Sequence, residues 1–385
     1  MKSNLKLLPY IFALVSITFW GFSFIWEDYL IKNNIEIFAF IFERMLLSAV
    51  ILWAVGLLIG SIQKIEKGDM KWMFLLALGE PFIYFLGENF GIKYTSGVLA
   101  AVIIATIPLF CTVIDRILYK FRLSFQKIFG CLLSLAGIIF FFMNKGGMGT
   151  SPLKGILLLF LFAVGGALIY GYTTKKMCQK YSPFTIVTYQ FTFGALLFLP
   201  LFLIFGLKGL TPEYFTMGVQ SKIFALALLC SCICFGLWAY CTGKLGVTRV
   251  NIFSALIPLV SAAVAYFLFP GQESFTTLKF IGIALTVTGV VFLANTTGIS
   301  PRACAAATAM AIPLASTVRT SSGFSSRNSF AQASPISKSS AVSIRWFRNI
   351  STLMISFPIP LPFSRIIRRS ASMGSSQKHE HSLCG

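Results

Sequence analysis

The chain alternates long apolar runs with short polar segments from near its start to about residue 298. An α-helix needs about 20 mainly apolar residues to cross the hydrocarbon core of a bilayer. The segments between the runs carry turn and charge signals, such as Asn144-Lys145-Gly146-Gly147 and Pro270-Gly271-Gln272-Glu273. The predicted spans are 8–30, 36–59, 72–92, 97–119, 125–143, 153–174, 184–206, 222–242, 247–269 and 277–295. The pattern therefore predicts an all-α membrane protein with ten transmembrane helices.

The composition argues against an ordinary soluble protein. Of the 385 residues, 56% are apolar and 11% are charged, whereas soluble domains carry roughly 25% charged residues. We therefore expect membrane lipid to cover the apolar surface. Of the net charge of +20, +11 belongs to residues 1–298 and +9 to residues 299–385. The basic residues of 1–298 are spread between the apolar runs and form no single basic face, so nucleic acid is not an expected partner.

The charges in the loops predict how the chain crosses the membrane, because short loops rich in Lys and Arg stay in the cytoplasm. With the N-terminus inside, the inner segments hold fourteen Lys and Arg residues and the outer segments hold seven. We expect a multi-pass protein of the cytoplasmic (inner) membrane with both termini in the cytoplasm. The apolar start lacks a small-residue cleavage site, so we expect it to be retained as the first span.

The sequence repeats itself. Ala105-Thr-Ile-Pro108-Leu is followed by glycines at 130 and 137, and Ala255-Leu-Ile-Pro258-Leu is followed by glycines at 282 and 289. The proline lies 22 residues before the first glycine in one copy and 24 in the other, and the two glycines lie seven apart in both. We therefore predict two five-helix repeats, 1–148 and 149–298. Because five is odd, the second is inverted relative to the first, an arrangement typical of secondary transporters.

Several short motifs carry a family resemblance over residues 5–296. They are Trp20-Gly21, Arg44, Gly91 to Ser96, Pro108-Leu109, Gly130/Gly137, Pro258-Leu259, Gln272-Glu273 and Gly282/Gly289. Together they resemble the EamA-type family of the drug/metabolite transporter (DMT) superfamily. The family's Gly-Glu pair before the last span of each repeat survives as Gln272-Glu273 and is lost in the first copy, near Lys120-Phe121. The resemblance implies a ten-helix permease for a metabolite or drug, with no particular substrate.

Charged residues inside predicted spans are the first candidates for a transport site, because such charges usually face a cavity or a partner. Glu43 and Arg44 lie in the second span, and Glu80 and Glu88 in the third. Arg44 is expected either to act in transport, by holding a substrate carboxylate or stabilising Glu80 or Glu88, or to form a structural ion pair between helices. Glu80 precedes Pro81, which should kink or break its helix, so its carboxyl group is expected to bind a cation or proton, or to touch water at a helix end. Glu88 is a coupling candidate or an interfacial residue.

Aromatic and amide side chains extend this candidate site. Tyr84 shares a helix face with Glu80, and Gln190 falls opposite Arg44 in the second repeat. Trp20 and Trp238 either stack on substrate or pack in the wall. Pro108 and Pro258 are interpreted as kinks, serving either gating or static packing.

No metal or cofactor site is expected. The only histidines are His379 and His381, and Cys230, Cys232 and Cys234 fan out over about 200° of a helix. No phosphate loop for ATP is present. These features predict a secondary transporter that moves a small metabolite or drug-like solute by alternating access, coupled to a proton, another ion or a substrate gradient. A membrane-embedded enzyme acting on lipid and a non-transporting scaffold or receptor remain alternatives, although we expect no enzyme.

The last segment, 299–385, differs in composition from the rest. It uses eight Arg and two Lys, whereas residues 1–298 use four Arg and eighteen Lys. It is rich in Ser and has a single acid, Glu380. This low-complexity basic tail is predicted to be disordered. Its reversed Arg/Lys preference favours a frameshifted or read-through end, with a regulatory or lipid-binding arm as the alternative.

Overall fold

The computed structural model describes residues 2–119, 125–142 and 152–268, and parts of 281–292. Every regular element in these ranges is helical. The α-helices are α1 (Lys2–Lys32), α2 (Ile37–Ile59), α3 (Met70–Ala77), α4 (Tyr84–Tyr94), α5 (Gly97–Ile104), α6 (Ile107–Tyr119), α7 (Phe125–Phe142), α8 (Pro152–Leu158), α9 (Gly165–Met177), α10 (Pro183–Leu201), α11 (Met217–Ala225), α12 (Cys234–Leu245), α13 (Val247–Asn251) and α14 (Ile257–Leu268).

Segments of π- or 3-10-helix join several of these helices into longer rods. They are η1 (Leu78–Ile83), η2 (Leu159–Val164), η3 (Phe202–Gly206), η4 (Leu207–Gly209), η5 (Leu226–Ile233) and η6 (Ile252–Leu256). Of these, η4 and η6 are 3-10 helices and the others are π-helical. A membrane span can therefore consist of two α-helices with a break between them.

Within the described residues, 8 helical stretches are long and apolar enough to cross a membrane. They are Leu7–Lys32, Ile37–Ile59, Met70–Tyr94, Gly97–Ile117, Leu153–Met177, Pro183–Gly209, Met217–Leu245 and Val247–Ala265. Each matches a span expected from the sequence, with ends that differ by a few residues. The fifth expected span coincides with α7, and the tenth, 277–295, lies largely outside the described residues, as does the tail. The spans are numbered below in the order expected from the sequence, so that Met217–Leu245 is span 8 and Val247–Ala265 is span 9.

Spans 3, 4, 8 and 9 are broken near their middle, and span 6 contains the π-helical segment η2 between α8 and α9. The break in span 3 is η1, where Glu80 takes an extended conformation (φ −145°, ψ 119°) inside the helix. The corresponding break in span 8 is η5. Span 4 is interrupted between α5 and α6, and span 9 between α13 and α14. Pro108 and Pro258 are each the second residue of the helix after the break, where the missing N–H leaves no helical hydrogen bond unmade. They begin new helices and do not kink continuous ones.

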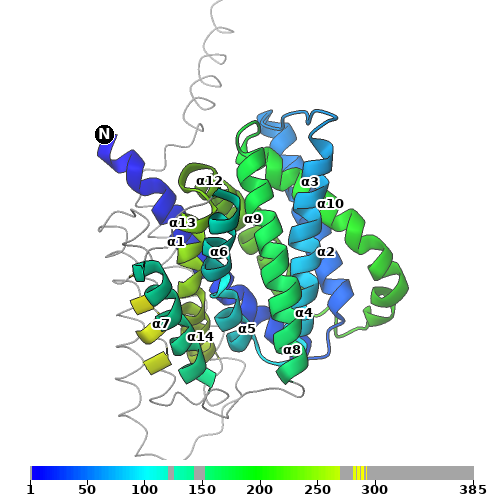
Figure 1. Cartoon of the computed structure of the whole chain (residues 1–385). Coiled ribbons are helices and arrows are strands. Elements are labelled where there is room, and N and C mark those ends of the chain that lie inside the picture. Colours follow the sequence, from blue (N-terminus) through cyan, green and yellow to red (C-terminus); the bar gives the residue numbers. More distant parts are fainter. Residues whose placement is uncertain are drawn as a thin grey trace, which may run out of the picture. The chain divides into compact units, whose positions relative to one another are not determined.

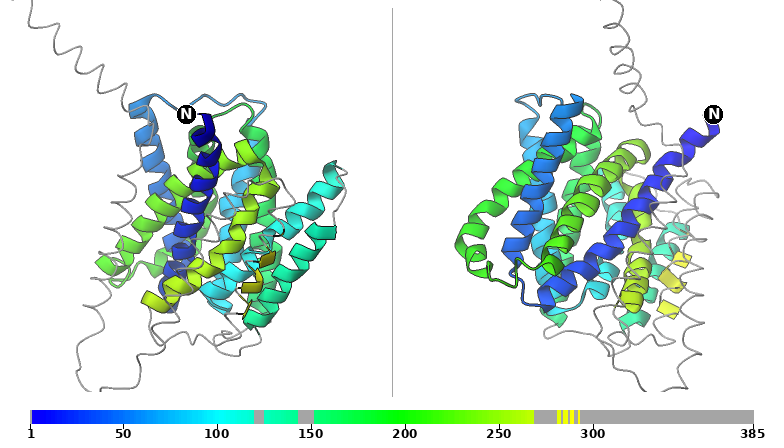
Figure 2. Two further views of the ribbon diagram at one scale, coloured as in Figure 1. Left: turned by 90° about the vertical axis from the view of Figure 1, so that its left-hand side faces the viewer. Right: turned by 180° about the vertical axis from the view of Figure 1, so that it is seen from behind.

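Segments distant in sequence pack side by side (Figure 1). Helix α2 packs extensively on α10, and α1 packs on α12 and α14. Two other views show α1, in dark blue, crossing obliquely beside the yellow-green α14 (Figure 2). Helix α9 runs against η1 and α3. The spans of the first half are thus interleaved with those of the second.

Glycine residues permit two close contacts between helices, one of α9 with η1 and one of α7 with the backbone at Gly282. A Cβ atom added to Gly166 of α9 would lie 2.5 Å from the carbonyl oxygen of Gly79 and 2.7 Å from the amide nitrogen of Tyr84. A Cβ atom on Gly137 of α7 would lie 2.5 Å from the carbonyl oxygen of Gly282. Helices approach this closely in a bilayer where a small residue removes the side chain between them. The second contact joins two glycines of the repeated sequence motif.

Candidate functional site

A central cavity lies where the four broken spans meet spans 1, 2 and 6. About 40 Å³ of this space is open to the centres of water-sized molecules. The lining residues come from both halves of the chain: Trp20, Ser23, Phe24, Arg44, Glu80, Tyr84, Phe85, Glu88, Ile104, Ile107, Ala167, Tyr170, Gly171, Phe235, Trp238, Asn251, Ser254 and Ile257. The predicted candidates Trp20, Arg44, Glu80, Tyr84, Glu88 and Trp238 are therefore brought together.

Arg44 is held on three sides. Its Nη1 donates a hydrogen bond to Oε1 of Glu27 at 2.6 Å, and its Nε donates to Oγ of Ser231 at 2.9 Å. The guanidinium carbon also lies 4.3 Å from the centre of the Phe85 ring. The Arg44 residue is 1% exposed. Of the two expected roles for Arg44, the geometry favours the structural ion pair, because a buried guanidinium needs a partner and Glu27 provides it.

Glu88 lies near this ion pair, within electrostatic reach of Arg44 and Glu27. The hydroxyl group of Tyr84, one helical turn away, donates to Oε1 of Glu88 at 3.0 Å. The other side of Glu88 faces Glu27, whose Oε2 is buried and receives no hydrogen bond from a protein donor. Glu88 is 2% exposed and lines the cavity. Glu88 is thus a buried cavity residue, and the interfacial interpretation of it is wrong.

Glu80 lies at the break in span 3. Pro81 lacks an N–H group and the extended Glu80 cannot continue the helix, so backbone carbonyl groups lose their helical partners. Nε2 of Gln190, from α10, donates to the carbonyl oxygen of Glu80 at 3.0 Å and replaces one lost bond. The Glu80 side chain is 7% exposed and faces the cavity. In the described part of the chain, no hydrogen bond or ion pair is found at its carboxyl oxygens, although Arg44 is near enough to act on it electrostatically.

The break in span 8 is satisfied differently. Nε1 of Trp20 donates to the carbonyl oxygen of Cys230 at 3.2 Å, and Oγ of Ser48 lies 3.3 Å from that of Ala227. A π-helical segment leaves carbonyl groups without the usual partners, and side chains from neighbouring spans fill that need in lipid. Three neutral polar residues, Cys230, Ser231 and Cys232, stand in η5 where η1 carries a carboxyl group.

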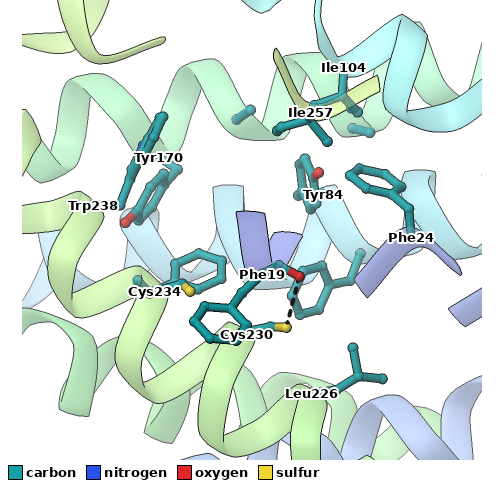
Figure 3. Packing of buried hydrophobic residues seen from close by; sticks show 14 of the residues in the cluster. Phe19, Phe24, Tyr84, Ile104, Tyr170, Leu226, Cys230, Cys234, Trp238 and Ile257 are labelled. Carbon is teal, nitrogen blue, oxygen red and sulfur yellow. Dashed lines mark hydrogen bonds between the residues drawn. The ribbon is translucent and has the colours of Figure 1, made fainter. Parts of the chain in front are cut away.

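Aromatic rings form much of the cavity wall. The rings of Trp20 and Trp238 have their centres 4.8 Å apart, and the Trp20 and Phe235 centres are 5.3 Å apart. Figure 3 shows Tyr170 beside Trp238, with Tyr84 and Phe24 across from them and Ile104 and Ile257 nearby. Trp20 therefore both packs in the wall and borders the cavity, as the two interpretations of the tryptophans allowed.

Other predicted candidates lie outside the cavity lining. Glu43 accepts a hydrogen bond from Tyr214 and lies within 3.5 Å of Nε2 of Gln220, close to the start of α11. Being one residue from Arg44, it faces about 100° away around the helix. Gln190 supports Glu80 through the backbone, and Pro81 supports the break. Pro108 and Pro258 stand one residue after the lining residues Ile107 and Ile257.

Glu27 and Ser231 are site residues that the sequence reasoning missed. Glu27 lies near the end of an apolar span, and the Glu27-Asp28 pair is easily taken for a helix end at the membrane surface. Ser231 lies between Cys230 and Cys232 inside an apolar run and carries no charge that would mark it as a site residue. The available signal was the charge of Arg44, which required a buried acid on a neighbouring span.

Asp115, also overlooked, joins both halves at the end of span 4. Tyr172 of α9 donates to Oδ1 of Asp115 at 2.8 Å, and Thr248 of α13 donates to Oδ2. The Tyr172 hydroxyl also lies 3.1 Å from the carbonyl oxygen of Cys111. Span 4 of the first half is thus tied to spans 6 and 9 of the second.

A loop latch joins the halves on the same side. Nζ of Lys180 lies 2.8 Å from Oδ2 of Asp69, and the hydroxyl of Tyr181 donates to that oxygen at 2.9 Å. The Lys180 hydrogen bond, with that of Tyr181, holds the pKa of Asp69 below its usual value, and the same Asp69 contact raises the pKa of Lys180. The amide of Ser182 donates to Oε1 of Gln63 at 2.6 Å. We call Gln63, Asp69, Lys180, Tyr181 and Ser182 the loop latch.

The described residues contain no cluster of His, Cys, Asp and Glu suited to a metal ion. The six cysteines described are all free, and those of η5 are buried. Sγ of Cys230 lies 3.4 Å from the carbonyl oxygen of Phe19 (dashed in Figure 3), and Sγ of Cys232 lies 3.6 Å from that of Ser48. The cysteines of η5 therefore pack against neighbouring spans.

Comparison with known proteins places the chain among transporters. An uncharacterized transporter of Archaeoglobus fulgidus is 27% identical over 298 residues, which is 75% of this chain and 97% of the relative. Uncharacterized transporter YdfC of Bacillus subtilis is 28% identical over 230 residues, 58% of this chain and 71% of the relative. A probable terminal-alkyne amino-acid exporter of Streptantibioticus cattleyicolor is 25% identical over 207 residues, 53% of this chain and 66% of the relative.

A solved crystal structure shares the fold with a TM-score of 0.57 at 18% identity, over 74% of this chain and 97% of that chain. The EamA-like transporter family matches twice, at residues 7–143 and 153–295. The names of the family and the relatives are those of transporters rather than enzymes. With the buried polar cavity between apolar spans, these matches show that the chain is a multi-pass membrane transporter and belongs to the EamA-like transporter family.

Proposed function

We propose that the protein is a secondary transporter that moves a small metabolite or drug-like solute through the central cavity by alternating access, with protons as the coupling ion. The observation that carries the proposal is the placement of a charged cavity where spans 3, 4, 8 and 9 are all broken. Broken helices that meet in the middle of the bilayer are the usual construction of a carrier site, because the freed backbone and the buried side chains line a cavity there.

The architecture proposed for this transport is a pair of inverted five-helix repeats, 1–148 and 149–298. Two matches to one family and the paired breaks in spans 3 and 8 and in spans 4 and 9 support it. With an odd number of spans in each repeat, the second has the opposite orientation in the membrane. The loop charges support a cytoplasmic location for both termini in the inner membrane. The loop latch and the Asp115 contacts then lie on the cytoplasmic side, where their opening would admit solute.

The charges support proton coupling. Glu27 and Arg44 compensate one another, which leaves Glu80 and Glu88 without a cationic partner among the residues that line the cavity. An uncompensated charge is expensive at this depth. Each carboxyl group is therefore neutralised by a proton or by a cation that enters. If a carboxyl group releases its proton on one side of the membrane and binds a proton on the other, the charge of the cavity depends on the side to which the cavity is open.

Proteoliposomes provide the test. Purified protein would be reconstituted and exposed to labelled metabolite mixtures with an inward or outward pH gradient. We expect saturable uptake of at least one solute that depends on the gradient, and we expect Glu80→Gln to reduce gradient-driven uptake by about tenfold or more while the protein stays folded in the membrane. The matched control is Glu43→Gln, which removes an acid from span 2 outside the cavity and should retain uptake.

The direction of the pH effect separates coupling from binding. If Glu80 exchanges a proton, the Glu80→Gln variant should still exchange labelled for unlabelled solute at equal concentrations on both sides of the membrane. A pH gradient should no longer accelerate its uptake. Uptake that responds to the gradient equally in wild type and Glu80→Gln would refute Glu80 as the coupling group. Absence of saturable flux for every solute, in folded protein of either orientation, would refute transport.

A further inference from the structure

The cavity offers negative charge without a cation to match it. Three carboxyl groups, those of Glu27, Glu80 and Glu88, surround one guanidinium group, that of Arg44. Arg44 is engaged: it contacts Glu27 and Ser231, and Phe85 covers its face. A substrate carboxylate would have to displace Glu27 to reach it. The cavity is therefore poorly suited to an anion.

The aromatic wall points to the same charge preference. Glu80 interacts electrostatically with the Tyr84 and Tyr170 hydroxyls, which places its carboxyl group among the aromatic residues of the cavity. Trp20, Trp238 and Phe235 complete this part of the lining. The face of an aromatic ring attracts a cation, and Trp attracts it most strongly. A carboxyl group beside several aromatic faces is a typical arrangement for binding an ammonium group.

We propose that the transported solute is an organic amine whose ammonium group binds Glu80 and whose apolar part lies against Trp20, Trp238 and Tyr170. This inference rests on the proposed transport function and adds the chemical class of the substrate. The ammonium group and a proton compete for the same carboxylate, so the two exchange: the amine enters as the proton leaves. An amino acid satisfies the site through its ammonium group alone, and its carboxylate finds no free cation in the lining.

Three compounds that share a 2-phenylethyl group test the charge preference: 2-phenylethylammonium, 2-phenylethanol and 3-phenylpropanoate. Their binding to the purified full chain in lipid nanodiscs would be measured by titration calorimetry at pH 7.5 and pH 5.5. We expect the ammonium compound to bind at least tenfold more tightly than the alcohol at pH 7.5, and the carboxylate to bind most weakly. At pH 5.5 the binding of the ammonium compound should weaken, because protons compete with it for Glu80.

Two variants locate the site. Glu80→Gln should remove the preference for the ammonium over the alcohol, while Glu43→Gln should keep it. Trp238→Leu should weaken ammonium binding about fivefold or more by removing an aromatic face and should leave the pH effect in place. Because the wild-type series alone tests the charge preference, the proposal stays open to refutation even if a variant fails to fold.

Equal binding of ammonium and alcohol, tighter binding of the carboxylate, or no saturable binding of the ammonium compound would overturn the proposal. So would a preference that survives in Glu80→Gln. Failure of transport is a separate result: protein that binds the ammonium compound but moves no solute in proteoliposomes contradicts the transport proposal and leaves the ammonium site standing. Gradient-driven uptake restricted to neutral or acidic solutes contradicts the ammonium site and leaves transport standing.

Discussion

The breaks in spans 3 and 8 share a position but differ in chemistry. In η1 a carboxyl residue and a proline interrupt the helix, and Gln190 from α10 donates to the freed carbonyl group. In η5 the helix is interrupted around three small neutral residues, Trp20 donates to the carbonyl group of Cys230, and the Ser48 hydroxyl lies 3.3 Å from that of Ala227. The charge that borders η5 comes from elsewhere, because Arg44 reaches Ser231 from α2.

This difference teaches how a two-half architecture acquires a polarised site. The backbone needs are alike on both sides, since each break requires donors from neighbouring spans. The side chains that meet those needs are not alike: Gln190 in one half stands where Arg44 stands in the other. The cavity charge is thus contributed by residues of spans 1 to 3 alone, namely Glu27, Arg44, Glu80 and Glu88.

Replacing Arg44 with Gln should have the largest effect on this comparison. The residue that contacts η5 from α2 would then be a neutral amide, as Gln190 is beside η1. Glu27 would then be left as a buried carboxylate without its cation, and breaking a buried ion pair costs about 3–5 kcal/mol. We expect a loss of that size in the free energy of unfolding, measured by SDS titration in mixed micelles.

The double variant Glu27→Gln/Arg44→Gln is the control for the Arg44 prediction. With both charges removed, the unfolding free energy should recover by a large part of the loss, whereas pH-driven uptake should not. If the single and the double variants are equally unstable, Arg44 supports the fold through Ser231 and Phe85 and not through Glu27.

The close contact of α9 with η1 gives the next largest effect. Gly166→Ala would place a Cβ atom 2.5 Å from the carbonyl oxygen of Gly79. Overpacking of this kind costs about 1–3 kcal/mol, and we expect both unfolding free energy and uptake to fall. Gly165→Ala is the matched control, since a Cβ atom there meets nothing within 4 Å. It should be neutral or stabilise the helix by about 0.5–1 kcal/mol, and an equal loss in both variants would contradict the close-contact explanation.

Removing the amide at the span 3 break should have a moderate effect. Gln190→Leu leaves the carbonyl group of Glu80 without a donor, and a buried group left unsatisfied costs about 1–3 kcal/mol. The comparable change on the other side, Ser48→Ala, should cost less, because the single Ser48 hydroxyl proton is donated to the carbonyl of Arg44 within its own helix at 2.6 Å and the contact to Ala227 is long at 3.3 Å. Unfolding measurements on the pair test this order, and a larger loss for Ser48→Ala would reverse the comparison.

The loop latch should give the smallest effect, because it lies at the surface, at the start of span 3 and away from both breaks. The depressed pKa of Asp69 contributes stability above the usual Asp pKa, and that contribution is lost as the pH falls through the depressed value. The raised pKa of Lys180 contributes below its usual value and is lost as the pH rises through the raised one. The latch is therefore complete from about pH 5 to about pH 9.

Asp69→Asn should lower the apparent melting temperature by a small amount at pH 7, and the difference should vanish as the pH falls through the depressed pKa of Asp69, where wild type also loses the charge. Thermal unfolding of both proteins in the same detergent across this pH range tests the prediction. A difference that stays constant with pH would show that the charge of Asp69 is not what the latch uses.

The sequence predicted the spans well and the site only in part. Hydropathy reports length and apolarity, so the ends of eight spans fell within a few residues of those observed. It does not report which way a residue faces. Glu43 and Arg44 were therefore indistinguishable as candidates, and only packing of α2 against η5 and α11 directs Arg44 to Ser231 and Glu43 toward Tyr214.

Other features could not be read from pattern because they depend on partners distant in sequence. The Gln190 amide has a role only once η1 lies beside α10. Glu27 looks like a surface acid until Arg44 is placed 2.6 Å away. Pro108 and Pro258 were predicted as kinks, but the breaks lie just before them. The Glu80-Pro81 break was foreseen, because proline alone requires it.

The cysteines of η5 have a practical consequence. Cys230 and Cys232 in η5, and Cys234 at the start of α12, are buried and free of disulfides. A thiol reacts with a maleimide only when water and reagent reach it. The rate at which a water-soluble maleimide modifies these native thiols, followed by mass spectrometry of the peptide around Cys232, would time the opening of the bundle without an introduced label. Addition of a transported solute should change that rate, so a solute can be recognised by its effect on labelling before any flux is measured.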